Sequence, residues 1–239
     1  MVDNSRGFQI VYNCKLPNNG VYFRVNVTDT LISLRTIFES LIDESWINSF
    51  FPENDWLHTS VLSRVQPTVE AIREDFDNGI NPTVNRDTGE KMVSEISRKI
   101  LVDDCGHWSI PLAELYKQKV DGNPGFDFHT VAEKQILMFG EAKYVKDATP
   151  YINAMTQITD FIANKKDMKD LYELHSFMPS EEPLNNANNG IKGYVAAFST
   201  NGKTDEYIID KVVSHQTYQN LSKYSLFIVI AVNLRTFLN

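Results

Sequence analysis

Residues 224–232 constrain the fold more than any other stretch, because they are apolar on both faces of an extended strand. Such a strand is typical of a sheet whose two faces are both covered by other elements. Residues 193–200 form a second β-rich segment, and the amphipathic residues 205–214 lie between the two. Together these segments predict a β-α-β unit within a buried, mixed sheet.

The remaining segments are mainly helical in pattern. Alternating β-branched and aromatic residues predict one early strand over residues 21–27. Apolar residues that recur every three or four positions predict helices over residues 31–41, 58–76, 90–102 and 150–162. The asparagine-rich residues 185–190 predict a mobile loop. We therefore expect an α/β protein with a mostly helical N-terminal accessory lobe over residues 1–104 and a sheet-containing core over residues 105–239.

Residues 125–144 place chemically useful side chains on a predicted hairpin. The pattern indicates two short strands joined by a polar turn near Glu133, with Asp127 on the first strand and Glu141 and Lys143 on the second. Successive side chains of a strand alternate between its faces, so Glu141 and Lys143 share one face, and the hairpin brings Asp127 alongside them. The sequence thus predicts two carboxylates and a lysine close together.

Such a cluster can hold a divalent metal ion. Mg²⁺ prefers oxygen ligands and keeps several waters, so Asp127, Glu141 and a main-chain carbonyl such as that of Ala142 would bind it and leave room for a phosphate. Lys143 would orient or deprotonate the attacking water and offset phosphoryl charge. The alternative is a solvated surface ion pair, which acids and lysines on adjacent strands form more often.

This stretch resembles the PD-(D/E)XK nuclease superfamily, which has an acid on one strand and an acid-x-lysine triplet on the next. Asp127 matches the first acid, and Glu141 and Lys143 match the triplet, whereas Phe126 stands where the motif has proline. The resemblance covers residues 105–239. It implies a restriction-endonuclease-like mixed sheet flanked by helices, Mg²⁺ or Mn²⁺ as the cofactor, and hydrolysis of phosphodiester bonds.

Two further site residues are implied by the same resemblance. An acid on the helix before the hairpin corresponds to Glu114, on a helix predicted over residues 110–119, and would be a third metal ligand. A glutamine on the following helix corresponds to Gln157. Each has a structural alternative: Glu114 on a solvated helix face, and Gln157 at the boundary of an apolar one.

The sequences Gly-Phe-Asp-Phe-His and Phe-Gly-Glu-Ala-Lys-Tyr around the two strands are most similar to the HamA nucleases of Hachiman anti-phage defence systems. The related abortive-infection nucleases share the same motif. This resemblance implies a bacterial deoxyribonuclease subunit that acts on DNA under the control of a HamB-like helicase partner. The alternative is a non-catalytic assembly or regulatory subunit that keeps the fold and acts by binding its partner.

Composition limits how such a protein would meet its substrate. The formal net charge is -8, from 31 acidic and 23 basic residues, which disfavours strong non-specific attraction to nucleic acid. We therefore expect a partner to supply part of the nucleic-acid affinity. Cys14 and Cys105 are far apart and suggest neither a disulfide framework nor a zinc site. The chain shows no signal peptide or membrane span, which predicts a cytoplasmic protein without membrane contact.

Overall fold

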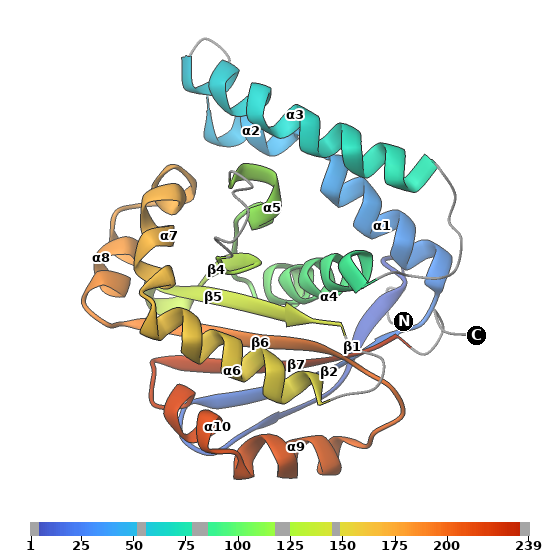
Figure 1. Cartoon of the computed structure of the whole chain (residues 1–239), viewed down its shortest axis with the longest axis vertical. Coiled ribbons are helices and arrows are strands. Elements are labelled where there is room, and N and C mark those ends of the chain that lie inside the picture. The colour runs from blue at the N-terminus through green and yellow to red at the C-terminus, as the bar shows by residue number, and fades with distance from the viewer. Residues whose placement is uncertain (1–4, 52–55, 78–85, 118–124, 145–148, 235–239) are drawn as a thin grey trace.

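A seven-stranded mixed sheet runs through the molecule, and helices cover both of its faces (Figure 1). The computed structural model describes residues 5–51, 56–77, 86–117, 125–144 and 149–234. The strand order is β1-β2-β7-β6-β5-β4-β3. The α/β class and the mixed sheet predicted from the sequence are therefore confirmed.

The strand direction changes three times across the sheet, at β1/β2, β5/β4 and β4/β3. The three central strands, β5, β6 and β7, are parallel to one another, and β2 is parallel to β7. At the two edges, β1 and β3 run antiparallel to β2 and β4, and β4 runs antiparallel to β5. The strands are β1 (Phe8–Lys15), β2 (Gly20–Val27), β3 (Trp108–Ser109), β4 (Phe128–Ala132), β5 (Ile136–Lys143), β6 (Lys192–Thr200) and β7 (Leu226–Asn233).

Parallel neighbours need crossover connections, and here helices supply them. The helices α6 (Pro150–Ala163), α7 (Lys166–Leu174) and α8 (Glu182–Asn188) connect β5 to β6, while α9 (Asp205–Ser214) and α10 (Gln216–Leu221) connect β6 to β7. In Figure 1, α6, α9 and α10 lie on one side of the sheet and α4 on the other. Every residue of β6 is buried as a result. Among the described helices, none combines the length and the apolar character needed to cross a bilayer.

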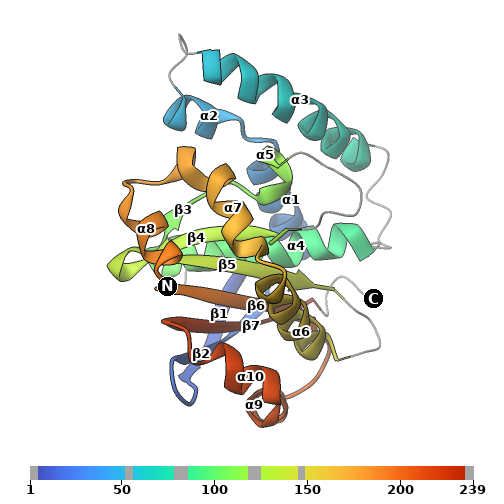
Figure 2. The same ribbon diagram turned by 60° about the vertical axis from the view of Figure 1, so that its left-hand side comes forward.

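The N-terminal region contributes both helices and strands. Its helices are α1 (Thr30–Ile42), α2 (Ser45–Phe50), α3 (Trp56–Asp77) and α4 (Arg86–Lys99), and Figure 2 shows α1, α2 and α3 beyond α4, away from the sheet. The short helix α5 (Ala113–Tyr116) follows β3, after residue 104. However, β1 and β2 belong to the same sheet as the later strands, with Gly20 opposite Phe227 and Asn26 opposite Asn233. The division into domains at residue 104 stays a prediction, and the sheet includes strands from both sides of it.

The helix predicted over residues 110–119 is wrong in its start and extent. Ser109, expected to cap that helix, instead pairs with Thr130 as part of β3. Ile110 gives its carbonyl oxygen to Arg98 at 3.2 Å rather than to a helical N–H. The described helix α5 is therefore a single turn, because tertiary hydrogen bonds hold the segment before it extended.

The mobile loop predicted over residues 185–190 is also wrong, since most of it is helix α8. Pro183 stands in the first turn of that helix, where its missing N–H costs nothing. The side-chain amide of Asn186 donates to the carbonyl oxygen of Gln135 at 3.2 Å. Contact with the turn between β4 and β5 thus fixes a segment whose composition is typical of a loop.

A buried ion pair within α4 makes hydrogen bonds to α1 and to the segment before α5. Arg98 donates to both carboxylate oxygens of Glu95, at 2.7 Å each, and to Ser109 Oγ at 2.8 Å. Ser40 of α1 also donates to Glu95. Only 1% of Glu95 is exposed, so its charge depends on these partners rather than on water.

We expect Glu95→Ala to lower the free energy of unfolding by about 3–5 kcal/mol, because it leaves the Arg98 guanidinium buried without a carboxylate. Urea unfolding monitored by circular dichroism measures this. Glu39→Ala is the matched control: Glu39 pairs with Arg35 at 2.7 Å on the exposed surface of α1, where loss of the pair costs less than about 1 kcal/mol. Equal losses in the two variants would contradict the structural role of the buried pair.

Candidate functional site

The structure brings the three predicted residues Asp127, Glu141 and Lys143 together at the end of β5. Phe128, the first residue of β4, pairs with Gly140 of β5 in the antiparallel register, and Asp127 directly precedes it. The Asp127 N–H donates to the carbonyl oxygen of the same Gly140 at 2.9 Å, so the register slips by one residue at Asp127, as in a β-bulge. The two acids are neighbours, since the charge of Asp127 raises the pKa of Glu141.

We call Asp127, Glu141 and Lys143 the acid cluster. Two hydrogen bonds hold its carboxylates in place. The Ala142 N–H donates to Asp127 Oδ2 at 2.7 Å, and Lys143 Nζ donates to Glu141 Oε1 at 2.7 Å. Each acid thus has one oxygen held by a donor on β5. The lysine contact arises from the alternation of side chains along the strand, as the sequence predicted.

Burial gives the acid cluster unusual electrostatics. Only 1% of Glu141 and 8% of Lys143 are exposed. Burial raises the pKa of Asp127 to about 6, even though the Ala142 N–H and Lys143 oppose the shift. Burial and then the Asp127 charge raise the pKa of Glu141 well above its usual value. Burial lowers the pKa of Lys143, but the charges of Glu141, Asp127 and Glu90 outweigh it, so the pKa is raised and the lysine stays protonated.

Glu90 of α4 is a site residue that the sequence did not single out. Its Oε1 lies 3.9 Å from Lys143 Nζ, and its charge raises the pKa of both Asp127 and Glu141. The only signal in the sequence was an acid at the start of a predicted amphipathic helix. That signal also fitted Glu114, and spacing alone gave no reason to prefer Glu90.

Glu114 and Gln157 lie outside the recorded contacts of the acid cluster. Glu114 is on α5 and pairs with Lys91 at 3.1 Å, next to Glu90 in sequence. Gln157 is half-buried on α6, and within the described part of the chain it makes no hydrogen bond to the cluster. Their assignments as a metal ligand and a catalytic residue therefore stay predictions.

The acid cluster has an oxygen atom that is available to bind a cation. Glu141 Oε2 is buried and has no hydrogen-bond partner among the described residues. With Glu90, three carboxylates surround Lys143, so negative charge is in excess. Within the described residues, no group of three or more His, Cys, Asp and Glu side chains is arranged to hold a metal ion by itself. A bound Mg²⁺ would need two carboxylates, main-chain oxygen and water, which is the donor set this ion accepts.

A second polar network holds the chain on both sides of Asp127. Lys117 Nζ donates to the Phe126 carbonyl oxygen at 3.2 Å and to Asp170 Oδ2 of α7 at 2.7 Å. His129 Nε2 lies 3.1 Å from the same carboxylate oxygen. Burial lowers the pKa of His129 to about 4, so its ring is neutral and donates to Asp170. Asp170 therefore fixes the residue before Asp127 and the residue two positions after it.

No protein-family model and no curated protein sequence matches this chain.

We expect Asp127→Asn to raise the free energy of unfolding by about 2 kcal/mol at about pH 8 in EDTA. The folded-state pKa of Asp127, about 6, lies above the ordinary value of 3.8, so the charged form costs stability above pH 6. This cost disappears as the pH falls toward 4, and so should the advantage of the variant. Asparagine keeps the oxygen that accepts the Ala142 N–H. Thermal unfolding at both pH values measures the difference.

Asp167→Asn is the matched control, because Asp167 is an aspartate with only 2% of its surface exposed that has a cation of its own. Its Oδ2 accepts hydrogen bonds from Lys192 Nζ and, at 2.8 Å, from the Tyr194 hydroxyl. That variant leaves Lys192 unpaired and should lower stability by about 3–5 kcal/mol. If Asp127→Asn instead lowers the free energy of unfolding at about pH 8, the charge of Asp127 stabilises the fold, and the prediction is wrong.

Proposed function

We propose that this protein is a metal-dependent nuclease that hydrolyses phosphodiester bonds in DNA. The observation that carries the proposal is the acid cluster, with Asp127 bonded to the Ala142 N–H next to Glu141 in sequence, and Lys143 bonded to Glu141. Its buried Glu141 Oε2, for which the described residues provide no donor, favours a cation at this place over a simple ion pair. The mixed sheet with helices on both faces is compatible with the resemblance to the PD-(D/E)XK superfamily.

Asp127 and Glu141 would hold Mg²⁺ or Mn²⁺, with Glu90 close enough to contribute directly or through water. The metal supplies charge that stabilises the phosphoryl group and lowers the pKa of a bound water. Lys143 stays protonated beside Glu141, which favours an electrostatic role, offsetting phosphoryl charge and orienting water, over general-base catalysis. Ala142 contributes its N–H, which holds Asp127 in place.

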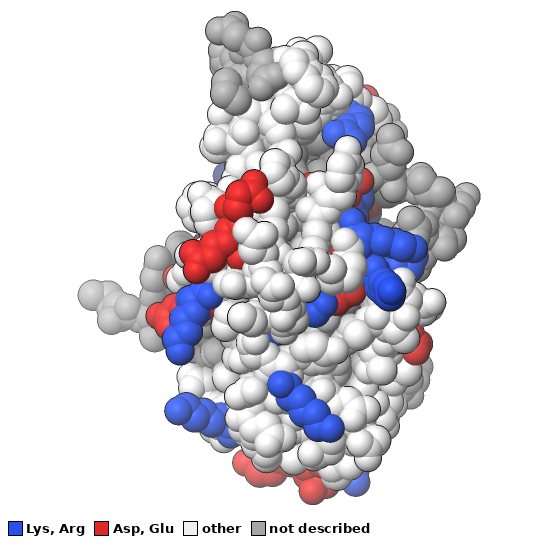
Figure 3. All heavy atoms as spheres, turned by 90° about the vertical axis from the view of Figure 1, so that its left-hand side faces the viewer, with Lys and Arg blue, Asp and Glu red and all other residues white. Residues whose placement is uncertain are grey.

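The surrounding charge supports a dependence on another chain. The net charge of -8 opposes binding to a polyanion, and the face in Figure 3 shows basic and acidic side chains interspersed rather than a continuous basic track. We propose that the protein is the nuclease subunit of a bacterial anti-phage defence complex, similar to HamA, and that a helicase partner delivers DNA to it or restrains it.

Nuclease assays on linear DNA with Mg²⁺, Mn²⁺ or EDTA test the proposal, with the chain alone and with a helicase partner. We expect Glu141→Gln and Lys143→Met to lower the cleavage rate about 10²- to 10⁴-fold, the usual range for a positioned group that acts in the transition state. Glu90→Gln should weaken activation by metal, seen as a higher Mg²⁺ concentration at half-maximal rate. EDTA should abolish cleavage.

Lys169→Met is the matched control, because Asp167, Met168 and Lys169 form a second acid-x-lysine triplet, and Lys169 is exposed on α7. Its rate should equal that of the wild type. Cleavage that survives Glu141→Gln or EDTA would refute the proposal. A wild type that cleaves no DNA under any of these conditions would also refute it and favour a non-catalytic subunit.

A further inference from the structure

A groove of about 920 Å³ opens between α3 and the segment formed by α7 and the short helix after it (His175–Phe177). Its floor is apolar and aromatic, with Phe51, Tyr116 and Phe177 all buried. These rings pack against one another, with the Tyr116 and Phe177 centroids 4.7 Å apart. The floor is therefore a packed aromatic surface.

Two large aromatic side chains line this groove from opposite walls and face solvent. Trp56, at the start of α3, is 75% exposed, and Tyr172 of α7 is 87% exposed. Exposed rings of this size cost free energy in water, so they suggest contact with another molecule. Rings on two walls of one groove are well placed to stack on flat, apolar groups.

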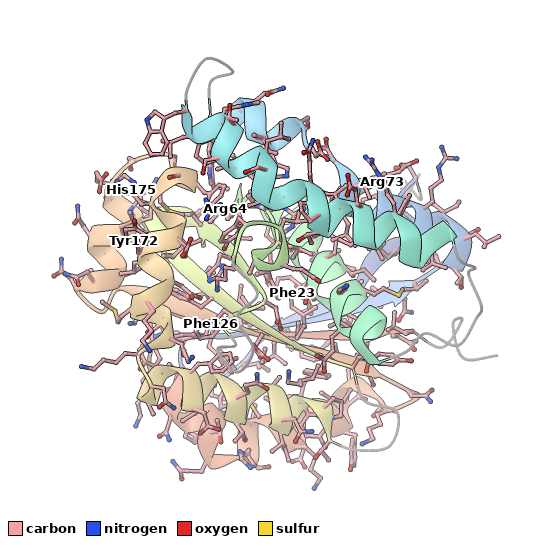
Figure 4. All side chains as sticks on the ribbon, turned by 45° about the horizontal axis from the view of Figure 1, so that its top comes forward. Phe23, Arg64, Arg73, Phe126, Tyr172 and His175 are labelled. Carbon is pink, nitrogen blue, oxygen red and sulfur yellow. The ribbon has the colours of Figure 1, made fainter. Side chains whose placement is uncertain are left out.

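Charged groups at the groove are few and of both signs. Arg64 of α3 is exposed, lines the groove and has no ion-pair partner among the described residues. Figure 4 shows it on the α3 side, with Tyr172 and His175 on the α7 side. Glu173 also lines the groove, so its net charge is close to zero. An occupant held here would gain more from stacking than from charge neutralisation.

The groove is connected to the acid cluster by a short path. The Tyr116 hydroxyl lies 3.0 Å from His129 Nδ1, and His129 is two residues from Asp127. Asp170 of α7, one residue before Leu171 in the groove wall, bonds both His129 and Lys117. The back of the groove is thus the network that holds Asp127.

We propose that this groove binds single-stranded nucleic acid, with bases stacked on Trp56 and Tyr172 and a phosphate on Arg64. The inference rests on the proposed nuclease function and names the form of its substrate. A single strand exposes the faces of its bases, whereas a duplex hides them in its stack, and base–aromatic stacking is independent of sequence. The weak charge of the groove fits this mode, because stacking and not phosphate contact supplies the affinity.

Binding of a fluorescein-labelled oligothymidylate of about 12 nucleotides, measured by fluorescence anisotropy on the full chain in EDTA, tests the proposal without cleavage. We expect Trp56→Ala and Tyr172→Ala each to weaken binding about 5- to 150-fold. A duplex of the same length should bind at least about tenfold more weakly. The slope of log K against log salt should be about -0.7, since Arg64 neutralises one phosphate of a single strand.

Tyr207→Ala is the matched control, because Tyr207 is 45% exposed and lies on α9. In Figure 1, α9 is at the bottom of the molecule, whereas α3 of the groove is at the top. It should bind like the wild type. Wild-type binding by Tyr172→Ala, equal affinity for the duplex, or no binding of the oligonucleotide would each overturn the proposal.

Cleavage of the same oligonucleotide in Mg²⁺ separates this inference from the nuclease proposal. If the wild type cleaves it and the groove variants bind and cleave equally well, the groove assignment is wrong and the nuclease stands. If the groove variants lose binding while the wild type cleaves nothing, either alone or with a helicase partner, the groove assignment stands and the nuclease is wrong.

Discussion

The parallel pairing of β5, β6 and β7 is the constraint on which the rest of the structure depends. Parallel strands cannot be joined by tight turns, so α6 to α10 cross over the sheet, and their packing with α4 removes both faces from water. A central strand in such a sheet is expected to be apolar throughout. Glu141 and Lys143 are exceptions, because they are charged residues on the buried strand β5. Burial of these ionisable groups is the main cause of the raised pKa of Glu141.

Much of the sheet could be predicted because its signals are local. Residues 193–200, 205–214 and 224–232 correspond to β6, α9 and β7 within two residues at each end, since apolar strands and an amphipathic helix carry their own periodicity. β1 was not predicted, because an edge strand with exposed Val11 and Tyr12 has little burial to impose a pattern. Nothing local shows that β2 pairs with β7.

The candidate site divides in the same way. Asp127, Glu141 and Lys143 could be placed together because strand alternation and a short hairpin fix their geometry. Glu90 could not, because it reaches Lys143 through the packing of α4 on the sheet, which no spacing in the sequence encodes. Asp170 was also beyond prediction: it meets His129 and Lys117 only after α7 has folded back over the strands.

The pairing of β2 with β7 has a consequence for how the chain is made. Residues 20–27 find their partner only in residues 226–233, roughly 200 positions later. At a translation rate of about 5–20 residues per second, the hairpin of β1 and β2 waits on the order of 10–40 s before β7 leaves the ribosome. Until then β2 has an unpaired edge, which is a template for wrong association. The exposure of this edge during synthesis is thus a property of the topology, independent of the chemistry at the acid cluster.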